Sequence, residues 1–179
     1  MLKNILKSLL IMFLFFSCEK GETNQFELRG ENGLSYNESF ELWNKLKENN
    51  GNSYVYKTKF VSWTNYGSST ELKIKNGIVV ERIFEKFRYL ESNGEKEIID
   101  SYFENIENLG THDKGALPKT IDALYNSCAS EYLMVNSKEN EIYFDTNENG
   151  LLSLCGFVPI GCVDDCFRGV QLDSFYWLE

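Results

Sequence analysis

The spacing of apolar and polar positions changes twice between a helical and an alternating period along this chain. Apolar residues recur at helical spacing over residues 37–48, which predicts a helix, and Ser35 with Glu38 has the spacing of a capping box at its start. Helical spacing returns after Pro118, where Thr120 is a suitable N-cap for a second helix.

Alternating patterns fill most of the remaining chain and predict β-strands. The dipeptide Asn76-Gly77 between two such runs is a strong signal for a two-residue hairpin turn. That turn would place Arg82 opposite Glu71 as a cross-strand ion pair, and the imperfect alternation after the turn predicts a bulge. The expected strands cover residues 54–63, 70–75, 78–90, 97–103, 140–145, 151–158 and 170–178.

This order of elements favours one fold class. A helix followed by a meander of strands does not alternate as a parallel α/β fold does. We therefore expect an α+β domain over residues 35–179, with an antiparallel sheet of about six or seven strands and two helices packed on one face. A chain of this length can bury a substantial core.

The first residues have the pattern of an export signal. Lys3 and Lys7 precede an apolar run over residues 9–16, which is shorter than the roughly 20 residues that a membrane-spanning helix needs. Ser17 and Cys18 follow, and this junction resembles the lipobox of bacterial lipoproteins. The resemblance implies that residues 1–17 are a signal peptide and that Cys18 is lipidated and inserts in a bilayer. The alternative is an ordinary secretory signal followed by a cysteine.

Residues 18–34 read as the lipidated cysteine and a flexible polar tether. Glu19, Lys20 and Glu22 partly resemble the surface-export signal of Bacteroidota lipoproteins, with Gly21 interrupting the acidic pair. We expect a lipid-anchored protein of the cell envelope, in the outer membrane, either periplasmic or surface-exposed.

The charge of the chain excludes one class of partner. The net charge is -9, and the signal segment contributes two lysines and no acid, so the remainder is more acidic still. An acidic surface repels phosphates, which argues against nucleic acid as a partner.

Four cysteines follow Cys18, and an even number in an exported protein indicates two disulfides. A metal site is the alternative, although the spacing is unusual for zinc. Sequence does not select among the three connectivities. We favour Cys128 with Cys155, because Cys128 shares the apolar stripe of the second helix, and Cys162 with Cys166.

Candidate chemistry is sparse. His112 is the single histidine, in a loop, and no serine is singled out as its partner, so we assign no catalytic residue and no cofactor. Asp145, Asn147 and Asn149 match the first half of a calcium loop, but Gly156 stands where the bidentate glutamate is needed. A turn rich in Asn and Gly explains the same residues.

Several short motifs in a fixed order give a resemblance over most of the chain. They are Trp43, Tyr54-Val-Tyr56, Asn76–Val80, Thr120–Tyr125 and Tyr143–Asp145. In this order they resemble a family of uncharacterised Bacteroidota envelope lipoproteins, a domain of unknown function. The resemblance implies an architecture and no activity.

These observations favour a membrane-anchored, non-catalytic binding or interaction module with a protein partner in the envelope. The alternatives are an envelope enzyme that uses carboxylates, and a calcium-dependent structural module.

Overall fold

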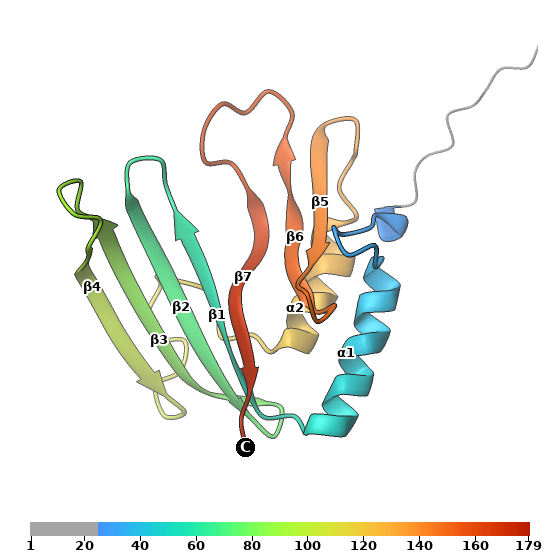
Figure 1. Ribbon diagram of the computed structural model, residues 1–179, viewed down its shortest axis with the longest axis horizontal. Coiled ribbons are helices and arrows are strands. Elements are labelled where there is room, and N and C mark those ends of the chain that lie inside the picture. Colours follow the sequence, from blue (N-terminus) through green and yellow to red (C-terminus); the bar gives the residue numbers. More distant parts are fainter. Residues whose placement is uncertain (1–24) are drawn as a thin grey trace, which may run out of the picture.

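Seven antiparallel strands form one sheet in the computed structural model, which describes residues 25–179, and their order is β4-β3-β2-β1-β7-β6-β5 (Figure 1). The strands are β1 Tyr54–Val61, β2 Tyr66–Lys75, β3 Ile78–Tyr89, β4 Lys96–Asn105, β5 Asn140–Thr146, β6 Leu152–Pro159 and β7 Arg168–Trp177. The helices are α1 Tyr36–Asn50 and α2 Ile121–Ser127, with short turns η1 Gln25–Glu27 and η2 Cys128–Tyr132. The expected α+β fold is confirmed.

Both helices begin where the sequence predicts. Ser35 accepts a hydrogen bond from the backbone of Glu38, and the Glu38 carboxylate accepts one from the backbone of Ser35, which completes the capping box of α1. Thr120 caps α2 by accepting from the backbone of Ala123. The second helix is shorter than its apolar pattern, because the chain continues from Ser127 as one π-helical turn.

The hairpin between β2 and β3 contains both the expected turn and the expected bulge. Asn76 and Gly77 have φ of 50° and 78°, the positive values that such a turn requires. Lys73 pairs with Glu81 rather than with Val80, so Val80 is the extra residue of the bulge. The bulge brings Lys73 and Glu81 into an ion pair at 3.0 Å.

The bulge also makes one predicted ion pair wrong. Arg82 lies opposite Leu72 rather than Glu71, because one extra residue moves every following side chain to the other face of the strand. Arg82 is thereby turned into the buried face of the sheet, where it pairs with Glu104 of β4.

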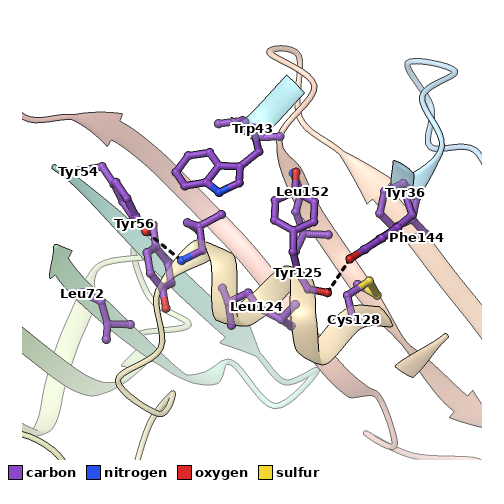
Figure 2. Packing of buried hydrophobic residues seen from close by; sticks show 14 of the residues in the cluster. Tyr36, Trp43, Tyr54, Tyr56, Leu72, Leu124, Tyr125, Cys128, Phe144 and Leu152 are labelled. Atoms are coloured by element: carbon purple, nitrogen blue, oxygen red, sulfur yellow. Dashed lines mark hydrogen bonds between the residues drawn. A yellow bond between two sulfur atoms is a disulfide. The ribbon is translucent and has the colours of Figure 1, made fainter. Parts of the chain in front are cut away.

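Aromatic side chains form the centre of the core (Figure 2). Trp43 of α1 is fully buried, stacks on Trp177 at 5.5 Å and meets Tyr54 edge-on at 5.2 Å. The hydroxyl of Tyr54 accepts a hydrogen bond from the backbone of Ile121, the first residue of α2. This contact attaches the start of α2 to the sheet.

Tyr125 of α2 provides the second link. Its hydroxyl lies 2.6 Å from Oγ of Ser39 on α1 and accepts from the backbone of Leu152 on β6. Tyr36 donates to the carbonyl of Tyr125 at 3.1 Å. One buried tyrosine therefore joins both helices to the same strand.

Residues 25–34, which the sequence assigned to the tether, pack against the domain instead. The backbone of Glu31 donates to Asp145 at 2.9 Å, and the side chain of Asn32 donates to the carbonyl of Asn147 at 3.1 Å. The side chain of Gln25 reaches the carbonyl of Val135. The polar residues that suggested a flexible tether make these hydrogen bonds instead. The lower bound of the tether and Cys18 lie outside the described residues.

Both expected disulfides are present. Cys128 bonds to Cys155 with a Cα–Cα distance of 5.7 Å and joins the helical layer to β6. Cys162 bonds to Cys166 in the connection between β6 and β7. No helix within residues 25–179 is both long and apolar enough to cross a membrane.

We expect the two disulfides to stabilise the fold unequally. Cys128–Cys155 closes a separation of 27 residues, and Cys162–Cys166 a separation of 4. Loop-closure entropy then predicts a loss of about 3–4 kcal/mol for the variant C128A/C155A and roughly 2 kcal/mol for C162A/C166A. Urea unfolding followed by tryptophan fluorescence measures both losses. Equal losses in the two variants would contradict this ranking.

Candidate functional site

The sheet face that carries the helices is only partly covered. Figure 1 shows α1 and α2 beside β5, β6 and β7, while β2, β3 and β4 extend away from them. Along β1, the buried residues Tyr54 and Tyr56 are followed on the same face by Thr58 and Phe60. Phe60 is 48% exposed. The helical layer therefore ends partway along β1.

A groove lies on this uncovered part of the face. It consists of two adjoining hollows of about 270 and 450 Å³ that share Phe60, Ser68 and Gly115. Its floor comes from β1, β2 and β3, one wall from the segment after β4, and the other from the start of β7. The first hollow is lined by Thr58, Lys59, Phe60, Ser68, Ser69, Thr70, Gly115, Ala116, Phe167, Gly169, Val170 and Gln171. The second is lined by Phe60, Ser62, Tyr66, Gly67, Ser68, Phe84, Lys86, Lys114 and Gly115.

One wall of the groove is held by a buried ion pair. Arg82 Nη1 lies 3.1 Å from Glu104 Oε2, and the two side chains are 1% and 0% exposed. Glu104 also accepts backbone hydrogen bonds from Gly110 at 2.7 Å and His112 at 2.9 Å. Arg82 donates to the carbonyls of His112 and Lys114. The pair thus fixes the segment that follows β4.

Further contacts hold the same segment at the groove. The ring of His112 stacks on Tyr102 at 4.0 Å, and Tyr102 donates its hydroxyl to the carbonyl of Lys114. The backbone of Ala116 donates to Thr70 Oγ1 on β2 at 2.9 Å. Residues 110–116 are therefore attached to three strands of the sheet.

These hydrogen bonds determine the charge state of Glu104. Burial removes water from the carboxylate and by itself raises its pKa. Hydrogen bonds from the backbones of Gly110 and His112, from the His112 ring and from Arg82 outweigh burial and lower the pKa to about 2. Glu104 is consequently ionised at neutral pH and can only accept hydrogen bonds.

His112 shows what acid–base chemistry the arrangement allows. Its Nδ1 lies 2.9 Å from Glu104 Oε1, so Nδ1 donates and the carboxylate orients the ring. Within residues 25–179, no serine, threonine or cysteine is hydrogen-bonded to the other ring nitrogen, and His112 does not line the groove. Glu104 and His112 hold the wall rather than form a nucleophile and base.

The charge of the groove differs from that of the chain. Among the described residues that line it there is no aspartate or glutamate, whereas Lys86 and Lys114 are present. Lys59 lines the first hollow too, but its ammonium lies over the ring of Tyr89 on the opposite face of the sheet. Asp100 pairs with Lys114 at 2.7 Å. Lys86 makes no ion pair within residues 25–179, although its charge helps to lower the pKa of Asp100. Lys86 is the basic group that the groove leaves available.

The calcium motif forms a turn. Asp145 Oδ1 accepts from the backbones of Glu31 and Thr146, and Asn147 Oδ1 accepts from the backbones of Asn149 and Leu151. Gly150 has φ of 77°, as the turn requires. Among residues 25–179, no group of three or more His, Cys, Asp or Glu side chains is placed to hold a metal ion.

Sequence reasoning missed the groove and the Arg82–Glu104 pair. The exposed aromatics that mark the groove follow one another in the stretch from Phe60 to Tyr66, and that stretch contains no charged residue. Aromatic residues in an uncharged stretch were the sequence signal that could have indicated the groove. Comparison with known protein families, with curated proteins and with solved structures finds no match for this chain.

We expect Glu104→Gln to destabilise the fold by about 3–5 kcal/mol at pH 7, because it leaves Arg82 buried without its counter-charge. The folded pKa of Glu104 lies below its ordinary value of 4.5, so its contribution is present above about pH 4.5 and is lost as the pH falls toward 2. In urea unfolding between pH 7 and pH 2, the difference in stability between the wild type and Glu104→Gln should narrow as the pH falls, because other carboxylates such as Glu85 and Asp100 titrate alike in both proteins.

Glu97→Gln is the matched control, because Glu97 pairs with Arg88 on β3 at an exposed site. It should cost less than about 1 kcal/mol. An equal cost for the two variants would contradict the role given to the buried pair.

Proposed function

We propose that the protein is a lipid-anchored module of the bacterial cell envelope that binds a ligand in the groove without chemically changing it. The anchor rests on the signal pattern that ends at Cys18. The binding role rests on the groove. The two parts of the proposal are independent and are tested separately.

The observation that carries the binding role is how the groove wall is made. A buried ion pair adds little net stability, because taking two charges out of water costs about as much as their attraction returns. Arg82 and Glu104 nevertheless direct most of their hydrogen bonds at residues 110–114. The network therefore serves to hold this segment in one position rather than to add stability. Lys114, in this segment, and Gly115, directly after it, line the groove.

The absence of an assigned catalytic set favours binding over catalysis. Hydrolytic chemistry needs a nucleophile, a base and an oriented acid around a cleft. In the described residues, His112 is the candidate base, its carboxylate partner is occupied by the loop, and neither lines the groove. The aromatic and hydroxyl side chains that do line it are suited to contact and hydrogen bonding.

We expect Cys18→Ala to abolish lipid attachment. Cells that express the wild type and grow with radiolabelled palmitate should yield a labelled protein in the membrane fraction, and the variant should yield an unlabelled one. Cys162→Ala, which also removes one cysteine sulfur, is the control and should remain labelled. Label in Cys18→Ala would rule out this anchor.

We expect a photo-reactive residue in the groove to capture the ligand in living cells. Ser68 is replaced by p-benzoylphenylalanine on the groove floor, and Ser174 on the exposed opposite face, where it pairs with Lys57, is replaced in the control. Ultraviolet light should give a slower-migrating adduct from position 68 and none from position 174. No adduct at 68, or the same adduct at both, would contradict binding in the groove.

A further inference from the structure

We infer that the ligand of the groove is an acidic oligosaccharide, a glycan that carries carboxylate groups. The inference rests on the proposed function and names the class of molecule that the groove takes. Charge, exposed aromatic surface, hydroxyl groups and the pairing of the floor strands each support it.

The first support is charge. The chain contains 27 acidic and 18 basic residues, yet the described lining of the groove includes the lysines Lys86 and Lys114 on its own face of the sheet and no acid. Lys86 lies in it without an ion pair among the described residues. Attraction to an anion is therefore local to the groove, while the acidic surface around it repels anions that do not fit.

The second support is the aromatic surface. Phe60 and Tyr66 are 48% and 44% exposed, and both line the larger hollow. Exposed aromatic rings gathered at one site indicate a binding surface. The faces of sugar rings carry C–H groups that pack on such rings, and the hydroxyls at their edges remain free for hydrogen bonds.

The third support is the set of hydroxyl groups. Thr58, Ser62 and Ser68 line the groove beside the aromatic rings. Within the described part of the chain, Ser68 Oγ makes no hydrogen bond and is half-buried on the floor. A hydroxyl both donates and accepts, which matches the mixed donors and acceptors of a sugar.

The pairing of the floor favours a glycan over a peptide. An extended peptide commonly binds by adding a strand to an unpaired sheet edge. In the larger hollow the floor strands β2 and β3 are interior to the sheet, since β2 pairs with β1 and β3, and β3 pairs with β2 and β4. Beside the smaller hollow, β1 and β7 no longer pair beyond Thr58 and Leu172. The floor of the larger hollow therefore offers side chains and no unpaired backbone, which is what a glycan uses.

Isothermal titration calorimetry on the full-chain lipoprotein in detergent tests this inference. The probes are short oligomers of galacturonate, of alginate and of hyaluronan, each compared with its methyl ester, which keeps the ring and removes the charge. We expect at least one acidic probe to bind and its ester to bind about tenfold more weakly. Absence of binding by all three probes, or equal binding of acid and ester, overturns the inference.

Two variants locate the binding. Lys86→Ala and Phe60→Ala should each weaken the best probe by about tenfold, through loss of a charged hydrogen bond and of an aromatic contact. Lys75→Ala and Phe103→Ala are the matched controls, since Lys75 and Phe103 are exposed side chains away from the groove. Weakening by the controls equal to that by the groove variants overturns the inference.

The light-dependent adduct at position 68 separates this inference from the proposed function. If a protease digest of the adduct contains peptides of a second protein, and the acidic probes do not bind, the ligand is not a glycan. Binding in the groove is then retained and the further inference is removed. No adduct at position 68 together with no binding removes both. An adduct that resists protease and is removed by polysaccharide lyase supports both.

Discussion

The buried pair of Arg82 and Glu104 is the constraint on which the uncovered half of the sheet depends. Beyond β1, no helix of residues 25–179 packs on the sheet face that carries α1 and α2, and an irregular segment after β4 lies there instead. An irregular segment cannot satisfy its own backbone groups, so it needs partners from the strands beneath it. The carboxylate of Glu104 accepts hydrogen bonds from backbone N–H groups of this segment, and the guanidinium of Arg82 donates to its carbonyls. Together they fix residues 110–114 against β3 and β4.

The other half of the sheet is held by hydrophobic burial with few polar links. Trp43 packs against Tyr54 and Trp177, and the hydroxyls of Tyr54 and Tyr125 satisfy backbone groups that burial would leave unpaired. Tyrosines serve here because each gives a large apolar surface and one hydroxyl that can bond to the backbone. The groove begins where this aromatic layer stops, between a region stabilised by burial and a region stabilised by hydrogen bonds.

Much of the fold could be predicted from the sequence, since the helix caps, the seven strands and the Asn76-Gly77 turn are local signals. The groove could not be predicted in the same way. Arg82 is turned inward by the single extra residue Val80, and no sequence pattern gives the position of a bulge to one residue. The partners of Glu104 lie in a segment without period, so neither their burial nor their pairing could be inferred. The packing of residues 25–34 was missed for the same reason.

The order of strands has a consequence for the order of folding. The two strands at the middle of the sheet, β1 and β7, are the first and last in the chain, and β7 is the element that joins the β1–β4 meander to the β5–β6 hairpin. A chain synthesised from its N-terminus contains both parts before the strand that unites them. The sheet therefore closes only after β7 has been made, and until then the two parts can be joined only by contacts that form late and between residues distant in sequence.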